Sequence, residues 1–197
     1  MSTAFHPSNR QKEVAQLTAA AFQIDRPSIT RFYDEQRVSD IGILVAPNSP
    51  EDGITSYATI GLSDHPLMRG GKEFSSRVEM LGLCDSAVQG FDNIISTLAF
   101  CVIKSKWFCA PGIIFPDVIS MYKISETMSS VYFASPFAWG NRFSSAEVDG
   151  LRVAWLMAIP ISDAESKLAQ TLGSAELEKL LIDHKIDVAD INRNSVI

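Results

Sequence analysis

Cysteine and histidine are both scarce in this chain of 197 residues, which contains three of each. The cysteines are an odd number, stand in apolar surroundings and show no C-x-x-C spacing, which argues against a disulfide framework or a zinc site. The histidines lie far apart and form no H-E-x-x-H or H-x-x-x-H motif. We therefore predict reduced core cysteines, no metal and no cofactor. The cysteines are Cys84, Cys101 and Cys109.

A long apolar run and a recognisable targeting segment are also missing. The longest apolar helical stretch, residues 94–103, is too short to span a bilayer. The N-terminal stretch MSTAFHPSNRQKE has no basic segment followed by an apolar run, so it does not resemble a secretory signal. These features predict a cytoplasmic protein that does not bind membranes.

Basic residues are in the minority, because the formal net charge is -6. Nucleic-acid-binding proteins usually carry a basic face, so we predict no nucleic-acid partner. The 46% hydrophobic and 20% charged content is that of an ordinary globular protein, and the length is that of one domain. We assign residues 1–26 to an N-terminal helical segment and residues 27–197 to the rest of the same domain.

Helices and strands can be placed from capping signals and apolar periodicity. Two capping boxes, at Ser8 with Gln11 and at Ser162 with Glu165, each start a predicted helix. The tail 187–197 is predicted to be an extended edge segment, and the sequence leaves open whether it is docked or free, although Val188, Ile191, Val196 and Ile197 favour docking. Helices are predicted over 8–23, 90–106 and 162–185, the last with a break at Gly173. Strands are predicted over 28–33, 41–46, 55–62, 74–83, 118–124, 131–134 and 151–161, which together indicate an α/β domain.

The strands 55–62 and 74–83 form a predicted hairpin-like pair joined by a polar, turn-rich loop. In the second strand, Val78 and Met80 alternate with Arg77 and Glu79, which is the period of a strand with one packed and one solvated face. We interpret Arg77 and Glu79, together with Asp64 in the loop, either as a charged patch that anchors a bound peptide or as an ordinary solvated sheet face.

The same loop offers only weak catalytic signals. Asp64 and His65 are adjacent and are interpreted either as an acid/base dyad or as a solvated pair. Ser63 lies in GLSDH, which lacks the second glycine of a nucleophile elbow, and the triplet at 70–72 lacks the upstream glycine of a phosphate-binding loop. The alternative function left open is an enzyme or binding protein for a small molecule, with a pocket near residues 63–79.

Aromatic side chains in the polar loop 136–150 pose a similar question. Trp139 and Phe143 would indicate a partner surface if they were exposed, and a covered core if they were buried. We predict no catalytic residues. The predicted partner-binding residues are Asp64, His65, Arg77, Glu79 and Trp139.

Five separated blocks of this sequence resemble the Suppressor of fused domain family. They occur in the order and spacing of that family over about residues 27–197. The resemblance implies an α/β (α+β) single domain, with a mixed, largely antiparallel central sheet flanked by helices, and no known catalytic activity. The blocks are TSYATIGLSDHPLM, RVEMLGL, WFCAPG, AWLMAIPISDAE and DINRNSVI.

The resemblance also implies a function through protein binding. The animal family includes a two-domain inhibitor that holds a transcription factor by adding its short extended segment as a strand, and this chain has the length of the first domain only. Compact members resemble bacterial immunity proteins, which neutralise a toxin by binding it. The implied function is a non-enzymatic immunity or antitoxin module whose acidity suits a basic partner protein, such as a nuclease toxin. A scaffold in a larger assembly is a further alternative.

Overall fold

The computed structural model describes residues 7–197, whose main sheet is mixed and has the strand order β1-β2-β3-β6-β10-β8-β7, with β9 paired to β10. Only β6 and β10 run parallel, and the other pairs are antiparallel. The strands of this sheet are β1 (Ser28–Tyr33), β2 (Asp40–Pro47), β3 (Ile54–Ile60), β6 (Arg77–Asp85), β7 (Ile114–Phe115), β8 (Ser130–Ala134), β9 (Ala146–Val148) and β10 (Leu151–Ile161). The predicted mixed, largely antiparallel sheet in a single α+β domain is confirmed.

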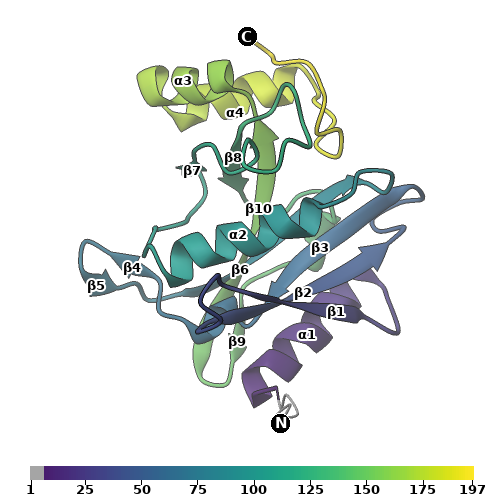
Figure 1. The fold of residues 1–197 in the computed structure, drawn as a ribbon, viewed down its shortest axis with the longest axis vertical. Helices are drawn as coiled ribbons and strands as arrows, with labels where there is room; N and C mark the ends of the chain where they lie inside the picture. Colours follow the sequence, from purple (N-terminus) through teal and green to yellow (C-terminus); the bar gives the residue numbers. More distant parts are fainter. Residues whose placement is uncertain (1–6) are drawn as a thin grey trace.

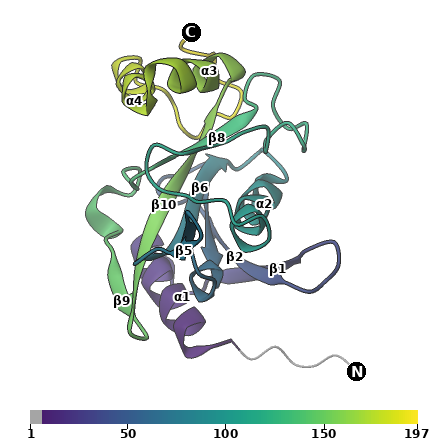
Figure 2. The same ribbon diagram turned by 90° about the vertical axis from the view of Figure 1, so that its left-hand side faces the viewer.

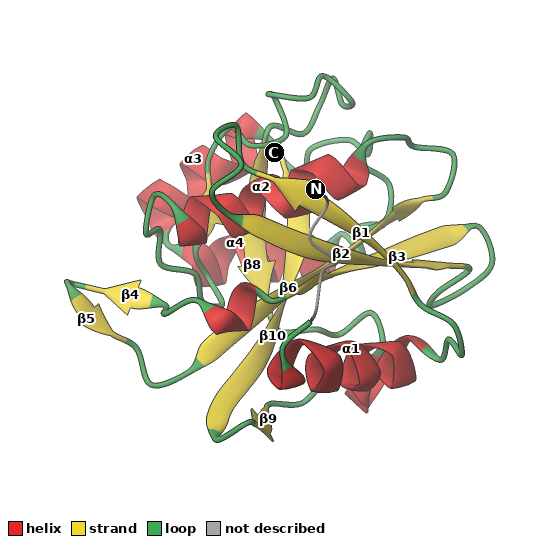
Figure 3. Ribbon diagram, turned by 60° about the horizontal axis from the view of Figure 1, so that its bottom comes forward, coloured by secondary structure: helices red, strands yellow, loops and turns green. Residues whose placement is uncertain are grey.

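Helices cover both faces of the sheet (Figure 1). The described residues form α1 (Asn9–Phe22), α2 (Phe91–Ile103), α3 (Asp163–Leu172) and α4 (Ser174–Asp183). Figure 3 shows α1 and α2 on opposite sides of the strands, while α3 and α4 lie together at the end of the molecule away from α1 (Figure 2). No helix among residues 7–197 is long and apolar enough to cross a membrane.

The capping boxes explain where two of these helices begin. The Ser8 side chain accepts a hydrogen bond from the backbone N–H of Gln11, and the Gln11 side chain accepts one from Ser8. The same reciprocal pair joins Ser162 and Glu165 at the start of α3. Both predicted helix starts are therefore confirmed.

The core consists of two apolar layers, one on each face of the sheet. Helix α2 lies directly on β6 because Gly82 has no side chain there: a Cβ atom would come within 2.6 Å of the Ile95 side chain. Ile41 and Ile43 of β2 belong to the layer under α2, whereas Leu44 and Ala46 belong to the layer under α1. Strand β2 is thus covered on both faces, as its continuous apolar run predicted.

Four sequence-based assignments are wrong. Residues 118–124 form turns instead of a strand: Val118 and Ile119 are both buried, so the segment does not alternate as a strand would. The loop 136–150 contains β9, and the strand predicted over 55–62 ends at Ile60, where the short helix η1 (Leu62–Asp64) follows. The predicted polar connection also contains a two-stranded hairpin, β4 (Met68–Arg69) and β5 (Lys72–Glu73).

Candidate functional site

Glu79 lies in the middle of β6 and is completely buried, with 0% of its surface exposed. It lies on the face of β6 that packs toward α1, in register with Trp155 of β10. The prediction of a solvated Glu79 is therefore wrong, because β6 is a central strand covered on both sides. A side chain in this position cannot contact a partner protein in this structure.

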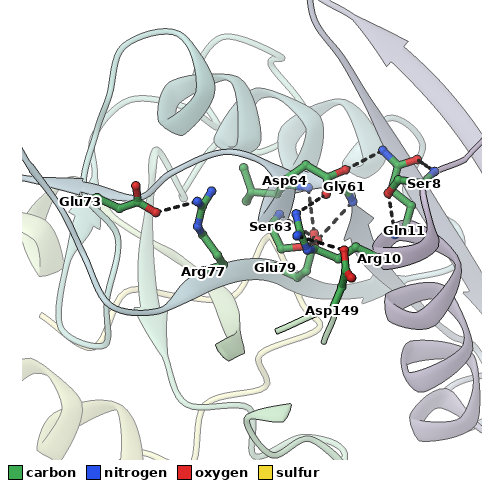
Figure 4. A network of polar contacts seen from close by, with 11 residues as sticks. Ser8, Arg10, Gln11, Gly61, Ser63, Asp64, Glu73, Arg77, Glu79 and Asp149 are labelled. Atoms are coloured by element: carbon green, nitrogen blue, oxygen red, sulfur yellow. Dashed lines mark hydrogen bonds and ion pairs between the residues drawn. The ribbon is translucent and has the colours of Figure 1, made fainter. Parts of the chain in front are cut away.

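Five hydrogen bonds hold the Glu79 carboxylate (Figure 4). The chain turns at Gly61, whose φ of 106° is a left-handed conformation that suits glycine, so that three successive amides point at the carboxylate. The donors are Thr59 Oγ1 at 2.5 Å, Gly61 N at 3.1 Å, Leu62 N at 3.3 Å, Ser63 N at 3.0 Å and Ser63 Oγ at 2.7 Å. Glu79 thus fixes the segment that follows β3 onto β6.

Burial raises the pKa of Glu79 to about 7, although the hydrogen bonds from Ser63, Thr59 and Gly61 act in the opposite direction. All five donors are neutral groups, and none supplies a positive charge. The carboxyl is therefore a structural group that changes protonation near neutral pH, enclosed by its own loop.

Asp64 is held by the first turn of α1. Its carboxylate accepts hydrogen bonds from Arg10 Nη1 and Gln11 Nε2, each at 2.9 Å, and Arg10 also reaches Asp149 at 3.3 Å (Figure 4). Because both oxygens of Asp64 are occupied in this way, the geometry does not support the acid/base dyad with His65. Burial lowers the pKa of His65, with Lys106 and Arg77 acting in the same direction and Asp64 opposing, so its imidazole is neutral at pH 7.

Arg77 begins β6 and pairs with Glu73 of β5 at 2.6 Å. The structure therefore separates the expected charged patch: Asp64 pairs toward α1, Arg77 pairs toward the β4-β5 hairpin, and Glu79 lies in the interior (Figure 4). These titratable groups are bound to fixed partners and do not converge on one cavity, which weakens the small-molecule alternative. No three His, Cys, Asp or Glu side chains within residues 7–197 are grouped so as to hold a metal ion.

Trp139 is also buried, with 1% of its surface exposed. Its indole N–H donates to Ser56 Oγ at 2.8 Å, and its ring lies 5.5 Å from those of Phe22 and Phe143. The 136–150 loop therefore covers the core next to α1, and the interpretation of Trp139 as an exposed partner contact is wrong.

The C-terminal tail is anchored by a buried ion pair that the sequence reasoning missed. Arg193 Nη1 and Nη2 meet the two carboxylate oxygens of Glu165 at 2.7 and 2.8 Å, and the amide of Val196 donates to Glu165 at 2.9 Å. Burial acts to raise the pKa of Glu165, but Arg193 and the donated hydrogen bonds outweigh it and hold that pKa below its ordinary value. The tail, whose docking the sequence left open, is docked, and it forms no strand. Glu165 and Arg193 both lie in blocks that resemble the family, AWLMAIPISDAE and DINRNSVI, and this was the signal in the sequence that could have pointed to them.

Comparison with known sequences gives the family. The profile of Suppressor of fused protein (SUFU) matches residues 37–194. Immunity protein YqcF of Bacillus subtilis (strain 168) is 38% identical to this chain over 190 residues, which make up 96% of this chain and 98% of that protein.

Solved structures show the same fold. A SUFU homologue from Neisseria gonorrhoeae FA 1090 aligns with a TM-score of 0.72 and 16% identity over 95% of this chain and 97% of that one. A chain of the Sufu-Fu complex aligns with a TM-score of 0.67 and 11% identity, over 97% of this chain and 93% of that one. Drosophila Suppressor of Fused aligns with a TM-score of 0.66 and 10% identity, over 96% of this chain and 52% of that one. Because the profile covers most of the sequence and the Bacillus relative nearly all of it, the chain belongs to the Suppressor of fused protein family.

Proposed function

We propose that this protein is an immunity protein, which neutralises a toxin by binding it directly and carries out no bond chemistry of its own. The observation that carries the proposal is the 38% identity to a bacterial immunity protein over almost the full length of both chains. An alignment of this extent includes the surface of the relative as well as its core, and binding specificity resides in the surface.

The polar groups of the candidate site agree with this function. Asp64, Arg77 and Glu79 are bound within the chain by ion pairs or hydrogen bonds. A binding protein uses such contacts to hold its surface rigid, so that little conformational freedom is lost when the partner binds.

We further propose that the partner is basic and that the encounter takes place in the cytoplasm. Five exposed carboxylates lie near the end of β6, because Asp85 N donates to Ala189 O in the tail and Ser86 N donates to Gly53 O in the β2-β3 turn. Such a concentration of negative charge accelerates association with a positively charged protein. The carboxylates belong to Glu51, Asp52, Asp85, Asp187 and Asp190.

Asp64, His65 and Arg77, which are partly accessible, remain the predicted direct contacts. They lie at the opposite end of β6 from the five carboxylates. Substitutions in one set therefore test direct contact with the partner, and substitutions in the other set test electrostatic acceleration of binding. Asp64 and Arg77 lie on either side of the buried Glu79 carboxylate, which the loop at 61–63 encloses (Figure 4).

The test is capture followed by protection. The tagged full chain is used as bait in its native host, and the recovered protein is then expressed in a sensitive bacterium with and without this chain. We expect a stoichiometric complex, restored growth, and an association rate that falls steeply as salt is raised from about 50 to 500 mM. Turnover of a small molecule by the purified chain, lost on substitution of one polar side chain, would contradict the proposal.

A further inference from the structure

An apolar groove of about 430 Å³ lies between α4 and the end of β8, and neither Glu79 nor the loop at 61–63 belongs to its lining. Its floor consists of side chains from the core layer that includes α4, and its walls come from α4, the segment after it and the residues after β8. Figure 2 shows α4 beside α3 at this end of the molecule. The floor residues are Tyr132, Ala134, Ile159 and Leu181.

Two large apolar side chains project beside this groove. Phe137 is 56% exposed and Ile182 is 66% exposed, and both belong to its lining. A groove with apolar side chains protruding next to it resembles half of an interface, in which the protruding side chains of one molecule fill the hollow of the other.

The groove also has one charge of each sign on its lining. Glu178 and Lys185 are both exposed, and within residues 7–197 neither has an ion-pair partner. Glu178 receives only a long hydrogen bond, 3.4 Å, from the Tyr132 hydroxyl. Each charge is therefore available to a partner that offers the opposite one.

We propose that this groove binds a second copy of the same chain, related by a two-fold axis that passes close to Ile182. A two-fold interface requires one surface to complement itself, so that residue i meets residue j and j meets i. Glu178 lies one helical turn before Ile182 on α4, and Lys185, whose N–H donates to Ile182 O at 2.9 Å, lies in the turn after it. Rotation about an axis at Ile182 therefore places the Glu178 of each copy opposite the Lys185 of the other.

A second copy fits this surface better than an acidic or a basic partner does. A strongly charged partner would leave one of the two rim charges facing its own sign, whereas an identical copy pairs both. The inference goes beyond the proposed immunity function, and it can be tested on the purified chain alone.

The experiment is sedimentation velocity on the full chain between about 1 and 300 µM, the range in which weak dimers dissociate. We expect a monomer-dimer equilibrium, and the substitution Ile182→Asp should weaken it at least about tenfold. Val38→Asp is the matched control, because Val38 is a similarly exposed apolar side chain, 74% exposed, that lies outside the groove in the β1-β2 connection, and its replacement should leave the equilibrium unchanged. The melting temperatures of both variants show whether they are folded.

Charge exchange tests the two-fold pairing itself. Glu178→Lys alone and Lys185→Glu alone should each weaken the dimer several-fold, and the double variant should restore it. A chain that stays monomeric at every concentration, a dimer that Ile182→Asp leaves intact, or single variants that the double variant fails to rescue would each overturn the proposal. Protection of the groove by a captured toxin, with no self-association, would also overturn it while leaving the immunity function standing.

Discussion

Two glutamates are fully buried among the described residues, and they differ in the charge of the groups that surround them. Glu79 is surrounded by five neutral donors and has its pKa raised to about 7, whereas Glu165 meets the Arg193 guanidinium and has its pKa lowered. Both carboxylates have their hydrogen bonds satisfied. The hydrogen bonds of Glu79 do not offset the cost of burying its negative charge, whereas at Glu165 the Arg193 guanidinium and the backbone hydrogen bonds together do.

The two sites therefore respond to pH in opposite directions. The folded chain binds a proton at Glu79 more tightly than the unfolded chain does, so the stability that Glu79 contributes is complete below its ordinary pKa of 4.5 and is lost as pH rises through about 7. The contribution of Glu165 is present above its ordinary pKa and is lost as pH falls through its lowered value.

The largest expected effect comes from removing the cation of the second site. Arg193→Ala leaves Glu165 buried without its counter-charge, which should lower the free energy of unfolding by about 3 to 5 kcal/mol at pH 7. Urea denaturation measures this change. Arg152→Ala is the control, because Arg152 is exposed and makes only a 3.5 Å contact with Ser145. A loss below about 1 kcal/mol for Arg193→Ala would mean that the ion pair does not anchor the tail.

An intermediate effect is expected at the first site. In the wild-type chain, ionisation of Glu79 should lower the free energy of unfolding by up to about 3 kcal/mol between pH 5 and pH 8, because 1.36 kcal/mol corresponds to one pKa unit. Glu79→Gln removes this titration, so the difference between the two proteins should shrink or change sign over that range. Urea denaturation at pH 5, 6, 7 and 8 gives both curves, and parallel curves would show that Glu79 has an ordinary pKa.

The smallest effect concerns a single donor. Ser63→Ala removes one hydrogen bond to Glu79, which should cost about 1 to 2 kcal/mol at pH 8 and less at pH 5, where the carboxyl is neutral. Ser86→Ala, which removes the neutral hydrogen bond between Ser86 and Thr55, should cost a similar amount at both pH values. If the two variants show the same pH dependence, the Ser63 hydroxyl does not stabilise the ionised form.

Local signals predicted much of the fold. The capping boxes at Ser8 and Ser162 act through backbone groups within three residues, so their effect can be recognised without tertiary information. Strand β10 was predicted with its exact bounds because a strand covered on both faces has an uninterrupted apolar sequence.

The candidate site was predicted less well, because its chemistry depends on segments distant in sequence. Glu79 alternates with apolar residues just as a solvated side chain does, and neither the central position of β6 nor the donors at 61–63 that satisfy the carboxylate can be read from that pattern. Trp139 lies in a loop, and its sequence neighbours do not show that its indole N–H donates to Ser56, which is distant in the sequence. The contacts of Arg10 with Asp64 and Asp149 likewise join three segments that are distant in sequence: α1, η1 and the β9-β10 turn.

The position of β10 has a consequence for biosynthesis. This strand pairs with β6 on one side and β8 on the other, so it joins the two halves of the sheet. It is translated after both of its neighbours, and until it emerges from the ribosome each of them has an open edge that can pair with another nascent chain. The risk of aggregation during translation therefore lasts until residues 151–161 have emerged from the ribosome and paired with β6 and β8.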